Sequence, residues 1–382
     1  MKIAHVSGYF MESASYQENL LTRGQSELGH EVHYLTSKYE PEFKINKSTR
    51  KKELGTSKFY DVIINRLPDY FEIKNKMVFL KNLIPIFKEI KPDIIFFHDV
   101  QFNIFYGLYY KWLYPDTKIH IDIHSDWTNA RHSFLGPAYH FFWRLFFKIF
   151  LKKFEKIFCI APECITFAEE HYKINQKDLV HLPLPGNANK LSEKKYISAK
   201  TRESLGFTKS NKVIIHTGKM PEDKETEKLL EAFAKIKNPN FRLIIAGSIE
   251  DHFMPVMEHY LSNDSRIKYV GWVNQKELKE YFLCSDILVQ PGTRSNSQID
   301  AICSGLPVIL SRSPQSEALT SFGNGILLDS VEINNIIESI HNVLDSNTFY
   351  EKSVELKNNR TLQNAVVLCE LLHQTRPQYP SI

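Results

Sequence analysis

The sequence lacks the features that would place it across a membrane or in an extracellular compartment. Its 382 residues contain no apolar run of the about eighteen residues that a spanning helix needs. The chain starts at Met1 and passes at once into a strand-like apolar run, without the hydrophobic region of a signal peptide. We therefore expect a cytoplasmic protein, at most peripheral on the inner face of the plasma membrane.

Cysteine is scarce and follows no pairing pattern. The five cysteines are scattered, mostly among apolar neighbours, and no C-x-x-C pair occurs. This distribution does not fit a disulfide framework and favours buried free thiols in a reducing compartment. The cysteines are Cys159, Cys164, Cys284, Cys303 and Cys369.

Blocks of positive charge are also missing. The net charge is +4 and the sequence pI is about 8.5, without a dense Lys/Arg segment. Nucleic acid is therefore not an expected partner. No D-x-D motif stands near the end of an expected strand, so we expect neither a required divalent metal nor another cofactor.

What the chain does contain is an alternation of short apolar strands and helices. In the first half an S-x-x-E capping box at Ser15 to Glu18 predicts a helix between the first two strands. A second helix is expected over Val78–Ile90, and the charged segment Tyr39–Ser57 is expected to be an exposed insertion. The expected strands are Ile3–Phe10, Glu31–Thr36, Phe59–Asn65, Ile94–His98, Lys118–Ile123 and Ile157–Ala161.

The second half repeats this alternation after a polar segment. Strands are expected at Lys212–Gly218, Phe241–Ala246, Ile267–Val270, Ile287–Val289, Val308–Leu310 and Gly325–Leu328, and helices at Glu225–Lys235, Lys276–Cys284, Val331–Leu344 and Leu362–His373. Such alternation with short turns predicts an α/β protein of doubly wound, Rossmann-like parallel sheets. A chain of this length suits two domains.

The predicted domains face each other across a cleft. The amino-terminal domain comprises residues 1–188. A linker over 189–209 leads to a nucleotide-binding domain at 210–355, and the segment 356–382 carries a helix that returns to the first domain.

The stretch from Asp286 to Val308 predicts a strand, a polar loop, a helix and another strand. Ser297 is a plausible N-cap for a helix over Gln298–Ser304, and Gly305 stands where a left-handed residue ends helices. The loop would then lie at a strand's carboxyl end and a helix's amino end, which attracts phosphate. Asp300, in the first helical turn, could reach the hydroxyls of a ribose. The alternative is an ordinary crossover with a solvated aspartate.

Three cations surround this predicted phosphate site. Lys219 follows Gly218 at the end of the second half's first strand, Lys224 comes five residues later, and Arg294 lies in the polar loop. Such a cluster would neutralise a diphosphate and stabilise it as a leaving group. The alternative is that both lysines are solvated surface residues, as most lysines are.

Polar residues also follow the strands of the first half. His98, His124 and Asp126 fall at the carboxyl ends of expected strands. In open parallel sheets this is where ligands bind.

The segment Tyr139–Lys156 has the most unusual composition in the chain. Arg144, Lys148, Lys152 and Lys156 recur every four residues, and aromatic and aliphatic side chains occupy most other positions. One interpretation is a core helix with a basic edge. The other is a helix lying in an anionic membrane surface.

Several of these motifs, in this order, resemble one enzyme family. Tyr16-Gln17-Glu18, Gly29-His30-Glu31-Val32, the Gly218–Lys224 loop, Gly271-Trp272-Val273 and the segment Gln290–Ile309 are similar to retaining glycosyltransferases of the GT-B architecture, in the family-four group that builds bacterial polysaccharides. The similarity covers most of the chain and is denser in the second half.

The resemblance implies a role for each matched residue. Lys219 and Lys224 match an Arg and a Lys that bind the donor diphosphate, although a lysine is a point charge rather than a fork. His124 matches a histidine that contacts the transferred sugar, with Asp126 beside it. Asp300 matches the ribose-binding glutamate. Gly271, Trp272 and Val273 would lie near the base.

One family position does not match. A sugar-binding glutamate is expected eight positions before Asp300, where this chain has Gly292, and no carboxylate lies between Pro291 and Ile299. Sugar recognition could pass to hydrogen bonds from the loop, whose polar members are Arg294, Ser295, Asn296, Ser297 and Gln298. Altered chemistry or an inactive site are the other two options.

The resemblance predicts transfer of a hexose or N-acetylhexosamine from a nucleoside diphosphate sugar to an acceptor hydroxyl, with retention. The acceptor would be a saccharide or a lipid-linked saccharide in bacterial surface polysaccharide or glycolipid assembly. Two alternatives remain: a nucleotide-sugar epimerase on the same architecture, and a non-catalytic binding or scaffold protein.

Overall fold

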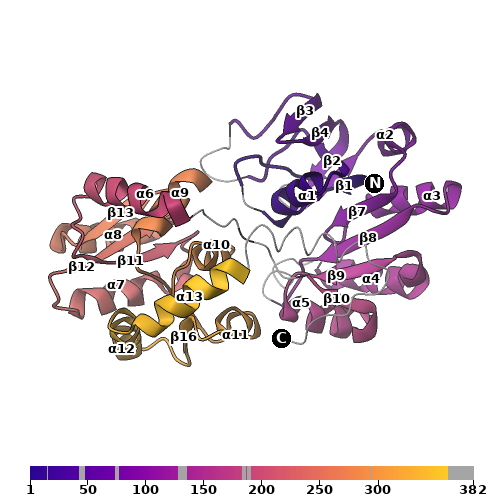
Figure 1. Ribbon diagram of the computed structural model, residues 1–382. Coiled ribbons are helices and arrows are strands. Elements are labelled where there is room, and N and C mark those ends of the chain that lie inside the picture. The colour runs from indigo at the N-terminus through magenta and orange to yellow at the C-terminus, as the bar shows by residue number, and fades with distance from the viewer. Residues whose placement is uncertain are drawn as a thin grey trace. The chain divides into compact units, whose positions relative to one another are not determined.

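A computed structural model describes residues 1–14, 16–42, 48–73, 77–127, 136–182, 186, 191–293 and 295–359. The described residues form two compact units, one within Met1–Leu184 and one within Pro185–Ala365 (Figure 1). Each unit is built around its own sheet, and the two are described in turn.

The first unit contains an eight-stranded sheet in the order β10-β9-β8-β7-β1-β2-β4-β3. All neighbouring pairs are parallel except β3 with β4. The strands are β1 (Lys2–Val6), β2 (Glu31–Ser37), β3 (Gly55–Phe59), β4 (Val62–Leu67), β7 (Ile94–His98), β8 (Lys118–Ile123), β9 (Lys156–Cys159) and β10 (Leu179–His181). The strand order reverses direction between β1 and β7, and we call this place the first switch point.

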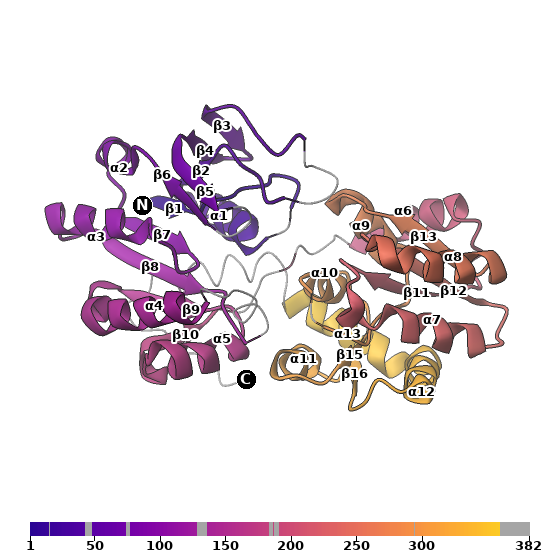
Figure 2. The same cartoon turned by 180° about the vertical axis from the view of Figure 1, so that it is seen from behind.

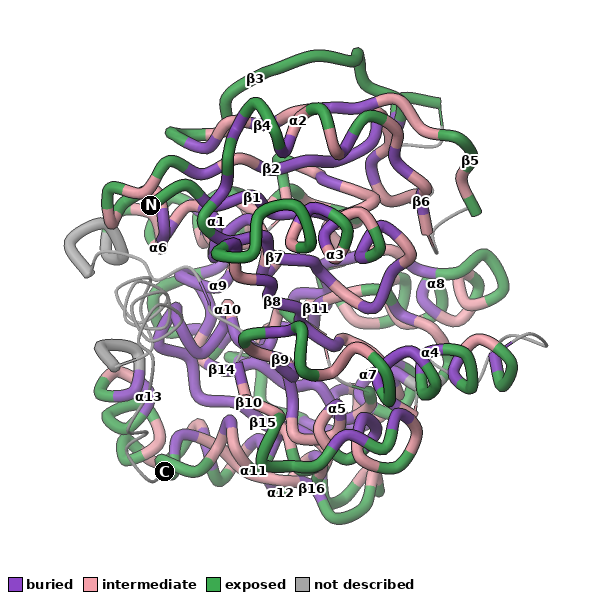
Figure 3. Tube along the Cα trace, turned by 90° about the vertical axis from the view of Figure 1, so that its right-hand side faces the viewer, coloured by how far each residue is buried: buried purple, intermediate pink, exposed green. Residues whose placement is uncertain are grey.

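Helices cover both faces of this sheet. On one face, α1 (Gln17–Glu27) places Leu21 against Phe96 and Phe158. On the other face lie α2 (Leu83–Ile90), α3 (Ile104–Leu113), α4 (Gly136–Phe150) and α5 (Pro162–Phe167), whose apolar residues share a core with Ile95 and Phe97. The alternate residues of β7 therefore face two different cores, and the whole strand is buried (Figure 3).

The second unit contains a six-stranded, fully parallel sheet in the order β13-β12-β11-β14-β15-β16. The strands are β11 (Lys212–Thr217), β12 (Phe241–Ala246), β13 (Ile267–Gly271), β14 (Ile287–Gln290), β15 (Val308–Ser311) and β16 (Gly325–Leu328). The order reverses between β11 and β14, which is the second switch point.

The helices of the second unit also lie on both sides of the sheet. They are α6 (Leu191–Ser204), α7 (Thr226–Lys235), α8 (Met254–Asn263), α9 (Gln275–Cys284), α10 (Ser297–Cys303), α11 (Pro314–Thr320), α12 (Ile333–Leu344) and α13 (Asn347–Asn359). The core residues of α7, α8 and α12 pack on the face that carries Leu243 and Val289. This architecture confirms the predicted α/β fold with two parallel sheets.

Part of the expected linker is helical. Within the segment 189–209, residues 191–204 form α6, and Arg202 fixes this helix to the second unit. Its guanidinium donates to the carbonyl of Cys284 at 2.9 Å and to the Asp286 carboxylate at 3.0 Å. The residues from 360 onward, which include the expected helix Leu362–His373, lie outside the described residues.

Two element predictions in the first half were wrong. The expected helix Val78–Ile90 is a strand, β6 (Met77–Leu80), followed by α2; Asn82 adopts φ 62° between them, which interrupts any continuous helix. β6 pairs with β5 (Asp69–Ile73) in an antiparallel hairpin (Figure 2). The single strand expected at Phe59–Asn65 is the β3–β4 hairpin, turned at Tyr60, which has φ 51°.

The predicted start of α1 and the predicted insertion also need correction. Ser15 lies outside the described residues, and the helix is preceded by Tyr16, whose side chain caps nothing. In the segment Tyr39–Ser57, expected to be exposed, Arg50 is buried because its guanidinium pairs with the Glu72 carboxylate. Burial of a paired arginine inside a charged segment leaves no trace in hydrophobic periodicity.

Two expected absences can be compared with the described residues. Within them no helix is long and apolar enough to cross a membrane. The four described cysteines, Cys159, Cys164, Cys284 and Cys303, are buried and free of disulfides, as expected.

Candidate active site

Both sheets present polar side chains at the carboxyl ends of the strands that flank their switch points. In open parallel sheets a ligand binds outside these strand ends, where the crossovers diverge. In the second unit the flanking strands are β11 and β14, which end at Thr217 and Gln290. In the first unit they are β1 and β7.

Gln290 organises the second switch point. This side chain is fully buried, and its amide nitrogen donates to the carbonyl and the hydroxyl of Thr217 at 2.9 and 2.8 Å and to the Ser297 hydroxyl at 3.0 Å. Its amide oxygen accepts from Ser295 at 3.1 Å and from Lys224 at 3.5 Å. A buried amide with every hydrogen bond made holds its neighbours in one arrangement.

Lys224 is almost completely enclosed by this network. It ends the short 3-10 turn Glu222–Lys224, and only 2% of the residue is exposed. Its ammonium donates to the carbonyl of Thr293 as well as to Gln290. Lys224 and Ser295 both lie near Gly218, since a Cβ built on that glycine would be 3.8 Å from each. The structure therefore brings together Gly218, Lys224 and the polar loop.

The predicted role of Ser297 as the N-cap was wrong. Helix α10 begins at Ser297 itself, one residue earlier than expected, and Asn296 precedes it without a capping side-chain bond. The Ser297 hydroxyl instead bonds Thr217 at 2.7 Å and Ser295 at 2.5 Å. With these two partners the hydroxyl does not cap the helix. Gly305 adopts φ 78° after the helix, as predicted.

The remaining predicted residues of this loop are more accessible. Lys219 is exposed at its side chain, although partial desolvation lowers its pKa. Asn296 is exposed and Asp300 is half-buried on α10. Arg294 lies outside the described residues.

Gly271, Trp272 and Val273 lie at the end of β13, on the same edge of the sheet and two strands away from β11. Gly271 has φ 69°, a left-handed conformation that turns the chain out of the strand. Trp272 is 39% exposed and Val273 is half-buried. An exposed aromatic ring at this edge can stack on a planar base.

Sequence reasoning missed two supports of this site. Gly247, with φ 147°, lies so close to the Gly218 carbonyl oxygen that an added Cβ would be 1.8 Å from it. His216 is buried beneath the loop, bonded to the Val289 carbonyl at 2.8 Å and to the Thr226 hydroxyl at 3.0 Å. Burial lowers the pKa of His216 to about 4, so the ring is neutral. In the sequence, the available signals were a glycine directly after a strand, Gly247, and a histidine within a strand, His216.

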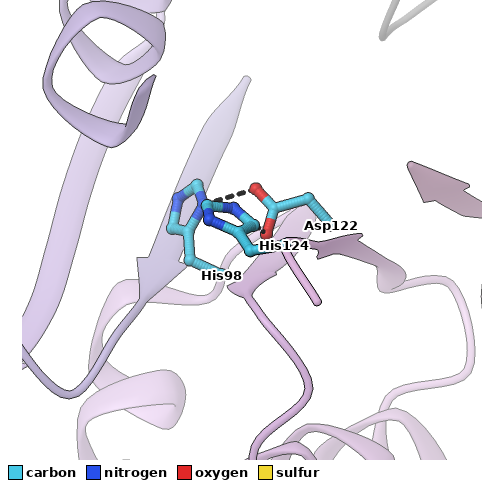
Figure 4. Close-up of side chains that lie close together, drawn as sticks. All are labelled: His98, Asp122 and His124. Atoms are coloured by element: carbon cyan, nitrogen blue, oxygen red, sulfur yellow. Dashed lines mark hydrogen bonds and ion pairs between the residues drawn. The ribbon is translucent and has the colours of Figure 1, made fainter. Parts of the chain in front are cut away.

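In the first unit, the cluster at the strand ends is centred on Asp122. One carboxylate oxygen of Asp122 lies 2.7 Å from Nδ1 of His98, and the other lies 2.9 Å from Nε2 of His124 (Figure 4). Asp122 and His98 are buried, whereas the His124 side chain is 26% exposed.

The charges of this cluster follow from its burial. Burial alone would lower the pKa of His124, but attraction to Asp122 and the hydrogen bond to it outweigh burial and raise the pKa to about 10. Burial likewise opposes ionisation of Asp122, yet His124 and His98 lower its pKa well below the usual range. Asp122 and His124 therefore form an ion pair at neutral pH.

Asp122 is a third residue that sequence reasoning missed. Asp126, which was predicted, is buried beyond the end of β8, but the carboxylate that joins both histidines is Asp122. The signal was present: in the β8 sequence Lys-Ile-His-Ile-Asp-Ile, every second residue is polar, which places His120, Asp122 and His124 on one face.

The same cluster contains the ligand types of a metal site. Among the described residues, His98, Asp122 and His124 offer ligand atoms that all lie within 4.8 Å of one another. Two imidazoles and a carboxylate could hold a transition metal ion, but Asp122 already pairs with Nδ1 of His98 through a hydrogen bond and with Nε2 of His124 as an ion pair.

Two protein-family models match this chain, each over one unit. The model described as glycosyltransferase family 4 matches residues 19–185, and the model described as glycosyl transferases group 1 matches residues 198–362. Together they account for both sheets and both switch points. The chain belongs to the family-four-like glycosyltransferases of the GT-B fold.

Solved structures of similar proteins confirm the fold of this glycosyltransferase. A glycosyltransferase from Rickettsia africae is 16% identical with a TM-score of 0.70, covering 98% of this chain and 99% of that chain. Sucrose-phosphate synthase from Thermosynechococcus elongatus is 14% identical with a TM-score of 0.69, covering 98% of each chain. HepE from Anabaena, solved with UDP, is 14% identical with a TM-score of 0.68, covering 97% and 99%.

A curated relative matches only a part of the glycosyltransferase. An uncharacterized glycosyltransferase of Methanocaldococcus jannaschii is 29% identical over 115 residues, which is 29% of this chain and 30% of that protein. Sequence similarity of this extent supports the family and leaves the donor and the acceptor to be argued from the site.

Proposed function

We propose that this glycosyltransferase moves a hexose or N-acetylhexosamine from a nucleoside diphosphate sugar to an acceptor hydroxyl, with retention at the anomeric carbon. The bond from the anomeric carbon to the diphosphate oxygen breaks, a bond to the acceptor oxygen forms, and the acceptor proton is released. The acceptor is a saccharide or a lipid-linked saccharide of bacterial surface polysaccharide or glycolipid assembly.

The observation that carries this proposal is the Gln290 network at the second switch point. The ammonium of Lys224 donates to uncharged oxygens of Gln290 and Thr293, which hold it at the carboxyl end of β14. Lys219 follows the end of the neighbouring strand β11. A diphosphate leaves more readily as these cations neutralise its growing charge, which is the usual largest contribution in such sites.

The other donor contacts are assigned by their place on the same edge. Trp272, between Gly271 and Val273, would cover the base, and Asp300 would bind the ribose hydroxyls. Similar structures carry UDP, UDP with glucose, and UDP-glucose, which supports a nucleotide sugar as donor.

Sugar recognition has to proceed without the carboxylate that Gly292 replaces. Ser295 and Ser297 turn their hydroxyls toward Gln290, so Asn296, which is exposed, is the better placed of the described loop residues. We propose that Asn296, together with Arg294 of the same loop, replaces the charged contact by hydrogen bonds. His124 and Asp126 in the first unit would contact the transferred sugar from the acceptor side.

A donor screen followed by charge removal tests the proposal. A nucleotide sugar that binds should raise the melting temperature in a concentration-dependent manner. With that donor, we expect Lys219→Met and Lys224→Met to lower kcat/KM at least about a hundredfold. The control is Lys228→Met, a neighbouring surface lysine paired with Glu225. Unchanged turnover in both site variants would contradict the diphosphate assignment.

The same assay separates the alternatives. Conversion of the donor sugar without acceptor would identify an epimerase, and failure of every nucleoside diphosphate to bind would favour a scaffold protein. The anomeric configuration of the product, read by NMR, decides retention. We also propose that no divalent metal is required, so that turnover in excess chelator should equal turnover without it.

We further propose that the first unit rests on an anionic membrane surface. Helix α4 ends at Phe150, so of the four regularly spaced cations only Arg144 and Lys148 lie on it; the expectation of one helix to Lys156 was wrong. One side of α4 is core, with Trp143 buried, while Ile149 is 71% exposed.

Helix α3 extends this surface. Its Trp112 is 73% exposed, and Phe105 on the same helix contacts Phe142 and Phe146 of α4. The exposed apolar residues of the two helices are Phe105, Tyr109, Trp112, Leu113, Phe141, Phe142, Leu145 and Ile149. Adjacent cations and exposed aromatics are the chemistry of an interface with anionic lipids.

Flotation with vesicles tests this surface. Vesicles containing phosphatidylglycerol should carry the protein upward, and the double variant Trp112→Ser, Ile149→Ser should reduce the bound fraction at least about tenfold. Tyr196→Ser, an exposed aromatic of the second unit, is the matched control. Equal flotation of all three proteins, or none with the wild type, would contradict the proposal.

A further inference from the structure

The hydrogen bonds at Asp122 continue into the interior of the first unit. On the far side of His98, its Nε2 lies 2.9 Å from Nδ1 of His5. Nε2 of His5 lies 2.6 Å from the amide of Gln25. The series is thus Gln25, His5, His98, Asp122 and His124, and we call it the histidine chain.

The topology explains why these side chains meet. β1, β7 and β8 are neighbours in the sheet, and His98 stands opposite Asp122 in the register of β7 with β8. His5 lies on β1 at the switch point, on the face that α1 covers, and α1 supplies Gln25. The chain therefore crosses the first switch point and joins elements far apart in sequence.

Aromatic neighbours fix the two inner rings. The rings of His5 and His98 are stacked with centroids 5.1 Å apart, and Phe96 stacks on both, at 5.3 and 4.9 Å. Tyr34 lies parallel to them on the other side at 6.2 and 6.0 Å. His5 and His98 are buried, so neither ring can turn without disrupting this packing.

The number of protons on the rings determines which atoms donate and which accept along the histidine chain. The ionised Asp122 only accepts, so Nδ1 of His98 and Nε2 of His124 each carry a hydrogen. If His98 is neutral, its Nε2 accepts from Nδ1 of His5, and Gln25 must then donate through its amide nitrogen. If the Gln25 oxygen accepts from His5, the two inner rings share one additional proton. In both cases His98 donates to Asp122.

We propose that the histidine chain positions His124 for sugar transfer. Gln25, His5, His98 and Asp122 act as positioning residues: they hold the Asp122 carboxylate, and the carboxylate holds Nε2 of His124. The opposite edge of the ring, with Nδ1, is thereby turned away from the carboxylate. This inference rests on the proposed function, in which His124 contacts the transferred sugar.

Other charged groups around Asp122 fit the same role. The backbone amide of Asp99 donates to Asp122 at 2.7 Å, and the Asp99 carboxylate accepts from the His124 amide at 3.4 Å. Glu18 on α1 adds a more distant negative charge that favours protonated His124. The ring is therefore held on its side chain and on its backbone.

Conservative variants of the inner rings test the proposal. His98→Phe and His5→Phe keep an aromatic ring in the stack and remove the hydrogen bonds. We expect kcat to fall about tenfold to a hundredfold with the KM for the donor unchanged within about twofold. The control is His120→Phe, a buried histidine on β8 that is not one of the links.

Nitrogen NMR of labelled histidine gives a readout independent of turnover. In the wild type the Nε2 hydrogen of His124 should exchange slowly, and in His98→Phe it should exchange at least about tenfold faster. Unchanged exchange together with unchanged kcat in His5→Phe and His98→Phe would overturn the proposal. A wild type that binds no donor would instead contradict the proposed function. The exchange measurement would still test whether the histidine chain holds His124.

A zinc titration tests whether the same nitrogen and oxygen atoms bind a metal ion instead. The histidine chain needs His98 and His124 protonated on the nitrogens that face Asp122, whereas a metal needs those nitrogens bare. We expect Zn²⁺ to leave both histidine spectra unchanged and to give no increase in turnover. Stoichiometric binding that shifts both spectra and raises turnover would overturn the positioning role.

Discussion

At the first switch point a buried carboxylate, Asp122, lies between two imidazoles; at the second, a buried amide, Gln290, lies between hydroxyls and an ammonium. The two places are topologically equivalent, since each is where the order of a parallel sheet reverses. The histidines near these two side chains, His124 and His216, differ in their protonation. His124 is protonated because Asp122 is near, whereas His216 is neutral because burial lowers its pKa, with a carbonyl and a hydroxyl as its hydrogen-bond partners.

Under the proposed function, the two switch points of this fold have different tasks: the first contacts an uncharged sugar and the second binds a charged diphosphate. In the first unit the charge of His124 is balanced by Asp122, which suits the contact with an uncharged sugar that the proposed function assigns to this ring. In the second unit the ammonium of Lys224 donates to uncharged oxygens of Gln290 and Thr293, and the proposed function places a phosphate beside it. We therefore propose that the uncharged Gln290 amide, together with Lys224, forms the diphosphate site.

The largest effect on the second site is expected from displacing the loop that follows β11, which contains Gly218 and Lys219. Gly247→Ala would bring a Cβ to 1.8 Å from the Gly218 carbonyl oxygen, so the loop carrying Lys219 must shift. We expect a loss of about 4 kcal/mol or more in the free energy of unfolding, which is exceptional for one substitution. Denaturant unfolding and donor binding measure both effects.

Gly323→Ala is the control for backbone strain. Gly323 also has a positive φ, 73°, but nothing lies within 4 Å of a Cβ built on it. We expect about 1 kcal/mol from the left-handed conformation alone. Equal losses in the two variants would mean that the close approach at Gly218 is not what fixes the loop.

The fold was largely predictable because it depends on periodicity. β12 was predicted residue for residue as Phe241–Ala246, and β11, β14 and β16 to within one residue, since buried parallel strands are continuous apolar runs bounded by turn residues. The first half was harder. Val78 to Leu80 is apolar and directly precedes α2, and an apolar run of this length does not separate a strand from a helix.

The site was predictable only where a residue follows a strand. Lys224, Ser295 and Asp300 stand after strands or at helix starts, which sequence patterns locate. Gln290 and Asp122 lie inside strands, where a polar residue can be interpreted only by knowing its neighbours across the sheet. His5 and His98 are 93 positions apart, and no local pattern relates two residues at that distance.

The pH dependence of stability sharpens the contrast between the two histidines. Burial holds the pKa of His216 at about 4, against 6.5 in the unfolded chain. As pH falls through this window, the unfolded state binds a proton that the folded state does not, so stability decreases. The expected loss is about 3 kcal/mol, since each pKa unit corresponds to about 1.4 kcal/mol.

His124 should show the opposite dependence. Its pKa is raised in the folded state, so its contribution is complete below pH 6.5 and is lost as pH rises toward about 10. Unfolding of the wild type, His216→Gln and Asp122→Asn across pH 4 to 10 measures both slopes. A wild type that loses as much stability between pH 6.5 and 4 as His216→Gln would contradict the neutral assignment.

Gln290→Glu places a carboxylate at the second switch point, where the first switch point has Asp122. The new carboxylate would take the place of the amide oxygen 3.5 Å from the Lys224 ammonium and cancel its charge. We expect donor affinity to fall about tenfold to a hundredfold, by the loss of one charge-assisted contact. Calorimetry with UDP measures it, with Gln290→Met as the variant that removes the hydrogen bonds without adding charge. Equal affinities in these two variants would show that geometry, not charge, is what Gln290 supplies.

The smallest expected effect concerns a hydrogen-bond partner of His216. Thr226→Val removes the hydroxyl 3.0 Å from Nε2 of His216 and keeps the shape of the side chain. We expect a loss of about 1 kcal/mol in the free energy of unfolding, the usual worth of one buried hydrogen bond. Thr348→Val, on the exposed surface of α13, should change stability by less than about 0.5 kcal/mol. The pKa of His216 should stay at about 4 in Thr226→Val, because burial is what lowers it, and a pKa that moves toward the ordinary value would contradict this assignment.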